Sequence, residues 1–101
     1  MKRKKMNKEN IDKFATSSAH LMMEGAAKYV LENQLTQLSP EEICYAIKRI
    51  SKIRVPIILK EAHETYEAVG IKHARMMAEL GFITIGIDAA KEVQGVSFGG
   101  S

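Results

Sequence analysis

A single cysteine, Cys44, and no tryptophan occur among the 101 residues of this chain. One cysteine excludes a disulfide within the chain and a metal centre built from several thiolates. It also favours a reducing compartment, so we expect a cytoplasmic protein. Because there are only three Phe and three Tyr, the aliphatic residues, alanine and the six Met must fill the core of what we expect to be one domain.

Long hydrophobic runs are also absent from the sequence. The longest uninterrupted apolar run covers residues 55–59, whereas a membrane-spanning helix needs roughly twenty apolar residues. No apolar stretch of signal-peptide length follows the basic N-terminus. We therefore expect a protein without a membrane partner.

Positive charge is unevenly distributed along the chain. Six of the fifteen Lys and Arg residues lie in residues 1–13, and the remainder of the chain is close to neutral. We assign residues 1–7 to a basic N-terminal arm. Such clusters attract phosphates and acidic surfaces, although a solvated terminus explains the same composition. The arm residues that would contact a nucleic acid are Lys2, Arg3, Lys4 and Lys5.

Apolar residues recur at three- and four-residue steps along most of the chain, which predicts an all-α fold. We expect a small bundle of three main helices, at about residues 8–32, 40–54 and 56–80, plus a short C-terminal element. These would form a single helical domain over residues 8–94. The first helix carries small residues on its apolar stripe, which favours close packing against another helix: Ala15, Ser18, Ala19, Gly25 and Ala26.

Helix boundaries are indicated by local signals. Ser39 is a suitable N-cap, Pro40 suits the first helical position, and Glu42 can complete a capping box. Pro56 disfavours helical geometry in the residue before it, which predicts that the second helix ends near residue 54. Gly81 is placed to cap the C-terminus of the third helix.

A basic stretch without acids extends from Lys48 to Lys60. In the second helix, Lys48, Arg49 and Lys52 lie on the side away from the isoleucines. These charges could face phosphates, or they could complement the negative C-terminal end of the helix dipole. We favour the second explanation, because acidic residues occupy the start of the same helix.

The C-terminal part of the chain has two interpretations. Apolar and polar residues alternate over residues 82–88, which suits a short strand. The same residues can instead lead into a final helix, and we favour the helix because a lone strand has no partner in a helical chain. Residues 95–101 are predicted to be a flexible glycine-rich tail.

The predicted third helix carries an apolar repeat with a seven-residue period between Val55 and Leu80. Such a repeat is typical of a helix that packs one seam against another helix. The seam is longer than two shorter neighbours can cover, so we expect a homo-oligomer. Its predicted interface consists of Leu59, Ala62, Tyr66, Val69, His73 and Met76.

Gly70 interrupts this helix and supports an alternative hypothesis. The segment from Ala68 to Ile83 resembles the helix-turn-helix of small bacterial regulators, in which a glycine flanked by apolar residues occupies the turn. The resemblance implies a DNA-binding regulator that uses residues 68–80. The residues at the start of its reading helix would be Lys72, His73 and Arg75.

Motifs for catalysis or metal binding are incomplete. His63 and Glu64 match part of a zinc-peptidase helix motif, but the second histidine is absent. Cys44 has no neighbouring base that would make it a nucleophile. Tyr66 and His73 could line a pocket for a small anionic ligand at a subunit interface, which is a further alternative. We therefore expect no enzymatic activity, no metal and no cofactor.

Taken together, these patterns favour a small regulatory or interaction protein of a bacterial cell or a phage. It would act without catalysis by docking a helical surface on a macromolecular partner. The helix-turn-helix DNA-binding regulator and the oligomeric ligand binder remain the alternatives.

Overall fold

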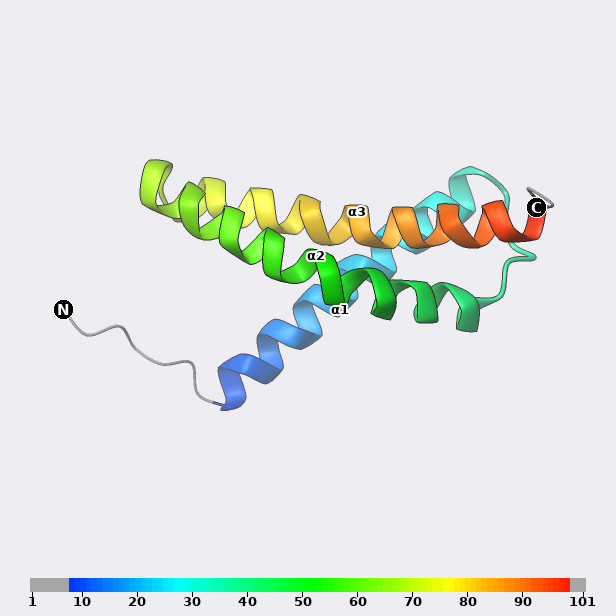
Figure 1. Cartoon of the computed structure of the whole chain (residues 1–101), viewed down its shortest axis with the longest axis horizontal. Helices are drawn as coiled ribbons and strands as arrows, with labels where there is room; N and C mark the ends of the chain where they lie inside the picture. Colours follow the sequence, from blue (N-terminus) through cyan, green and yellow to red (C-terminus); the bar gives the residue numbers. More distant parts are fainter. Residues whose placement is uncertain (1–7, 99–101) are drawn as a thin grey trace.

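The computed structural model describes residues 8–98, which form three α-helices: α1 (Lys8–Glu32), α2 (Pro40–Val69) and α3 (Ile71–Phe98). α2 and α3 run antiparallel as a long hairpin, and α1 crosses one half of it obliquely (Figure 1). The all-α prediction is confirmed, and residues 8–98 contain no strand. The predicted basic arm, residues 1–7, lies outside the described residues. None of the three helices is both long enough and apolar enough to cross a membrane.

The second helix continues beyond its predicted end. α2 passes through Pro56 and ends at Val69, so the prediction of a boundary near residue 54 is wrong. A proline inside a helix frees the carbonyl group four residues earlier, here that of Lys52. Both Pro56 and Lys52 are exposed. Water can therefore hydrate the freed carbonyl group, and the helix tolerates the proline.

Gly70 reverses the chain between α2 and α3. Its φ of 98° and ψ of 178° form a conformation that is almost confined to glycine. The Gly70 N–H donates to the carbonyl oxygen of Tyr66 at 3.0 Å, and the Ala74 N–H donates to that of Gly70 at 3.2 Å. The predicted helix over residues 56–80 is therefore wrong, because its two halves belong to different antiparallel helices.

The C-terminal segment is part of α3. This helix continues through Gly81 and residues 82–88 to Phe98, so Gly81 is not a cap and there is no separate short element in residues 71–98. Residues 95–98 of the predicted tail are also helical. Gly81 has a packing role, since a Cβ there would lie 2.9 Å from Cδ1 of Ile58 in α2.

The start of α2 confirms two of the predicted signals, the N-cap Ser39 and Pro40 at the first helical positions. The Glu42 N–H donates to Oγ of Ser39 at 3.3 Å, as expected for an N-cap. The same hydroxyl donates to Oε2 of Glu41 at 3.0 Å. A backbone hydrogen bond and this hydroxyl together lower the pKa of Glu41 below its ordinary value. The cap thus satisfies a free backbone donor and orders the first turn.

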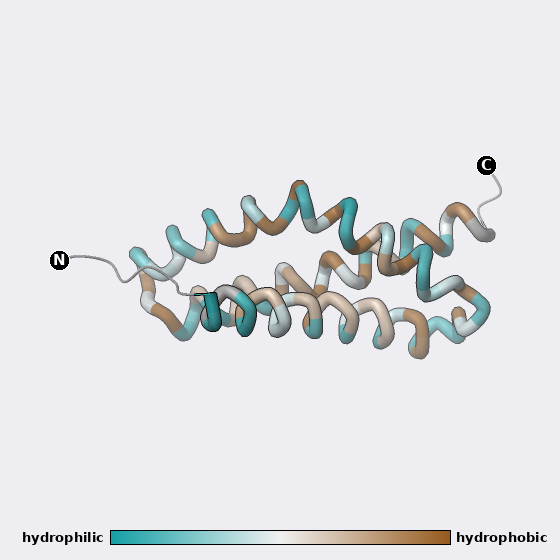
Figure 2. The backbone as a smooth tube through the Cα atoms, turned by 90° about the horizontal axis from the view of Figure 1, so that it is seen from below, coloured by the Kyte–Doolittle hydropathy of each residue, from teal (hydrophilic) through white to brown (hydrophobic). Residues whose placement is uncertain are grey.

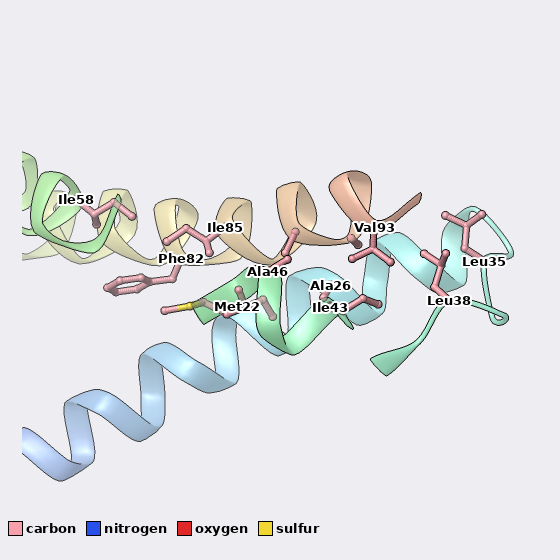
Figure 3. Packing of buried hydrophobic residues seen from close by; sticks show 13 residues of the cluster. Met22, Ala26, Leu35, Leu38, Ile43, Ala46, Ile58, Phe82, Ile85 and Val93 are labelled. Atoms are coloured by element: carbon pink, nitrogen blue, oxygen red, sulfur yellow. The ribbon is translucent and has the colours of Figure 1, made fainter. Parts of the chain in front are cut away.

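The core lies along α3, which packs against both α1 and α2. Phe82, Ile85 and Val93 of α3 face buried residues of the other two helices (Figure 3). α1 approaches α3 so closely that a Cβ at Gly25 would overlap the carbonyl oxygen of Ile83. The prediction of close packing by the small-residue stripe of the first helix is confirmed at Gly25.

Candidate interaction surface

The end of the α2–α3 hairpin lacks a core of its own. We call residues 59–80 the hairpin tip; they comprise the last turns of α2, Gly70 and the first turns of α3. Ala74 is the one buried residue in this range. α1 diverges from the hairpin toward its own N-terminus and does not cover the tip (Figure 1). Hydrophobic and hydrophilic positions alternate along the backbone of the hairpin tip (Figure 2).

Large apolar side chains are exposed on the hairpin tip. Their exposed fractions lie between 42% and 66%. The side chains come from both helices of the hairpin: Leu59, Tyr66, Val69, Ile71, Met76 and Leu80.

The predicted oligomer interface maps to the tip but not to one continuous seam. Leu59, Ala62, Tyr66 and Val69 belong to α2, whereas His73 and Met76 belong to α3. Because the chain reverses at Gly70, a repeat that is collinear in the sequence is divided between two antiparallel helices. Their role as an interface between copies of the chain stays a prediction.

The candidate DNA-reading residues lie at the start of α3. Lys72, His73 and Arg75 are all exposed. In a helix-turn-helix, the two helices meet at about 90–120° through a turn of about three to four residues. Here Gly70 alone joins two antiparallel helices that lie side by side (Figure 1). This geometry does not favour insertion of the start of α3 into a DNA groove.

The sequence did not predict a second surface, which we call the α1–α2 groove. α1 and α2 both pack on α3 but make little contact with each other, and an open groove of about 590 Å³ lies between them. Its walls are largely apolar and carry small side chains. These include Ala15, Ser18 and Ala19 of α1 and Cys44, Ser51 and Val55 of α2.

Methionines and one hydrogen bond complete the groove. Met22 and Met23 line it from α1, and the Ser51 hydroxyl donates to the sulfur of Met22 at 3.1 Å. Methionine side chains adapt their shape to different partners. Met22 is buried in the core and Met23 is exposed, so Met23 is the methionine that can adjust to a side chain entering the groove.

The basic residues of α2 fall into two sets. Arg49 pairs with Glu92 and Arg54 pairs with Asp88, so these two arginines link α2 to α3. The pair with Glu92 raises the pKa of Arg49 above its ordinary value. Lys48 and Lys52 instead line the α1–α2 groove and have no ion-pair partner within residues 8–98.

The described residues show no assembled metal site: no group of three or more His, Cys, Asp or Glu side chains in them could hold an ion. His63 forms an ion pair with Glu67 through Nε2 at 3.3 Å when it is protonated. The pairing gives His63 a structural partner on the surface of α2.

Comparisons with protein-family models, curated protein sequences and solved structures find no match for this chain. The hairpin tip and the α1–α2 groove are therefore the features from which a function can be inferred. A sequence signal did exist for the groove, in the small residues of α1 and the unpaired lysines of α2. It could not be interpreted without knowing that α1 packs against α3.

Proposed function

We propose that this protein is a non-enzymatic interaction protein that docks its hairpin tip on a macromolecular partner. The supporting observation is the exposure of six large apolar side chains on a segment in which Ala74 is the one buried residue. These side chains stay in contact with water unless a binding partner buries them. A partner would supply the third layer that α1 supplies to the other half of the hairpin.

Burial of the exposed tip side chains would contribute favourable free energy to association. Full burial of a large apolar side chain contributes roughly 1.5–3 kcal/mol. Six side chains that are about half exposed would contribute roughly 1 kcal/mol each, before the entropic cost of association is subtracted. This balance suits a reversible complex.

A second copy of the chain is one partner that we propose for the tip. Two tips related by a two-fold axis would bury the same apolar surface on both copies, as isologous interfaces do. A different macromolecule with a complementary apolar surface is the other. The identity of the protein crosslinked in the experiment described next separates these two partners.

The test is site-specific photo-crosslinking in the native cells. A photo-crosslinking amino acid replaces Tyr66, and irradiation should give one discrete adduct, identified by mass spectrometry. The substitution Leu59→Glu should abolish that adduct, because Leu59 and Tyr66 are seven residues apart and share one face of α2. Since Leu59 is exposed, circular dichroism of this variant should match that of the parent protein.

The matched control carries the same crosslinker in place of Lys28, an exposed residue of α1. We expect no adduct there. Equal adducts at both positions, or none at Tyr66, would contradict the proposal. Light scattering of the purified protein with a generic DNA duplex adds an independent arm. Salt-sensitive binding that is lost in Lys72→Ala/Arg75→Ala would replace our proposal with DNA recognition.

A further inference from the structure

The α1–α2 groove has the form of an incomplete helical bundle. α1 and α2 both pack on α3, and the open space between them is where a four-helix bundle would place another helix. Along α2 the groove extends from Cys44 to Val55. At 1.5 Å per helical residue this is about 16 Å, or about three helical turns. Small residues on both walls allow a helical backbone to approach closely.

The charge at the groove is of one sign. The residues that line it include Lys48 and Lys52 and no Asp or Glu. The neighbouring arginines of α2 are neutralised by Glu92 and Asp88 of α3, whereas the two lysines have no ion-pair partner in the described part of the chain. An occupant that carries carboxylates would therefore complement this groove, and a basic occupant would not.

We infer that the α1–α2 groove binds an amphipathic helix of another protein whose apolar face is flanked by Asp or Glu. Lys48 and Lys52 are four residues apart, so they lie one turn apart on the same side of α2. Two carboxylates with the same spacing on the bound helix would face them. Apolar side chains at three- and four-residue steps would enter between α1 and α2, as in other helix-in-groove complexes. This site is separate from the hairpin tip and goes beyond the function proposed for the tip.

The experiment uses three fluorescent peptides of about four helical turns with one Leu/Ala face. Their flanking positions, spaced four residues apart, carry Glu in the first peptide, Gln in the second and Lys in the third. Fluorescence anisotropy with the full-length protein should show the Glu peptide binding about five-fold more tightly than the Gln peptide, as expected for two exposed ion pairs. The advantage should decrease as salt is added.

Charge reversal provides the specificity control. In Lys48→Glu/Lys52→Glu the preference should invert, so that the Lys peptide becomes the tightest binder. The matched control Lys60→Glu/Lys72→Glu makes the same charge change at exposed positions outside the groove. Its preference should remain that of the parent protein.

Cys44 reports whether the peptide occupies the groove. It is the sole cysteine of the chain, it is partly buried, and it lines the groove. The Glu peptide should slow the reaction of its thiol with Ellman's reagent. Ala19→Phe, which fills the groove, should abolish peptide binding, whereas Ala27→Phe at an exposed position of α1 should not.

Several results would overturn this inference. They are equal binding of the three peptides, no binding by any of them, and binding without protection of Cys44. Oleate binding that depends on Lys48 and Lys52, without peptide binding, would assign the groove to a lipid. Self-association that Ala19→Phe abolishes would assign it to a second copy. The crosslink from Tyr66 should persist in Ala19→Phe, so failure of the groove proposal and failure of the tip proposal are distinguishable.

Discussion

Gly86 of α3 lies against the backbone of Met22 in α1, so closely that a Cβ at Gly86 would overlap the Met22 carbonyl oxygen. The same Cβ would lie 2.8 Å from the backbone nitrogen of Ala26. Gly25 makes the corresponding approach to Ile83 from the other helix. These two glycines let α1 follow α3 at backbone contact, and α1 consequently leaves the groove open on the side of α2.

We predict that Gly86→Ala destabilises the protein. The added methyl group would force the backbones of α1 and α3 apart, and overpacking of this kind costs about 1–3 kcal/mol. Urea unfolding followed by far-UV circular dichroism measures the loss. Gly25→Ala should behave in the same way, because its Cβ would meet backbone atoms that cannot rotate away.

Gly95→Ala is the matched control for this prediction. Gly95 is also in α3, but a Cβ there would have no heavy atom within 4 Å. Alanine is more favourable than glycine inside a helix by up to about 1 kcal/mol, so this variant should be as stable as the parent or slightly more stable. Equal stability of Gly86→Ala and Gly95→Ala would mean that the crossing of α1 and α3 is not close.

We predict that Gly70→Ala destabilises the hairpin and promotes an exchanged dimer. The space around Gly70 is open, so the cost is the backbone conformation itself, about 1–3 kcal/mol for a residue with a side chain. The seven-residue repeat continues in phase through this position. A straightened α2–α3 helix therefore keeps its apolar seam, and a second copy can supply the missing half, as in domain swapping. Light scattering should show a larger dimer fraction.

Gly70→Asn tests whether position 70 has the ordinary left-handed helical conformation or one that is restricted to glycine. Asparagine tolerates the left-handed helical region, where ψ is near +47°, but the ψ of Gly70 is 178°. We therefore expect Gly70→Asn to be as disruptive as Gly70→Ala. A stable, monomeric Gly70→Asn protein would contradict the proposed conformation of the turn.

We predict that Ser39→Ala weakens the start of α2 and raises the pKa of Glu41. Loss of an N-cap side chain costs about 1 kcal/mol. In the folded protein a backbone hydrogen bond and the Ser39 hydroxyl lower the pKa of Glu41 below 4.5. Without the hydroxyl the pKa should rise toward that value but remain below it, because the backbone hydrogen bond is retained. An NMR titration of the Glu41 carboxyl group measures this change.

The sign of the pH dependence follows from the lowered pKa. A carboxyl group with a lowered folded-state pKa stabilises the protein above its unfolded pKa, and this stabilisation is lost as the pH falls through the folded value. The contribution of Glu41 is thus present above about pH 4.5. Glu41→Gln should remove it while keeping the hydrogen bond from the Glu42 N–H to Ser39. An unchanged Glu41 pKa in Ser39→Ala would exclude the proposed hydroxyl contact.

Local chemistry made part of the fold predictable from the sequence. The all-α class follows from the apolar periodicity, and the start of α2 follows from Ser39 and Pro40, whose interactions involve residues within one helical turn. The exposed apolar surface of the tip was also predictable in part. The repeat carries more apolar side chains than the neighbouring helices can bury, and this holds whether or not the chain reverses at Gly70.

Tertiary packing decided the rest. Pro56 and Gly70 are both helix-disfavouring residues, and their local preferences do not reveal that α2 continues through the first and ends at the second. The outcome depends on the antiparallel packing of α2 on α3, which stabilises a helix through Pro56 and a reversal at Gly70. The α1–α2 groove likewise exists because α1 packs against α3 rather than α2. Contacts between helices join residues that are far apart in the sequence. The apolar periodicity of each helix shows which face is buried but not which other helix covers that face.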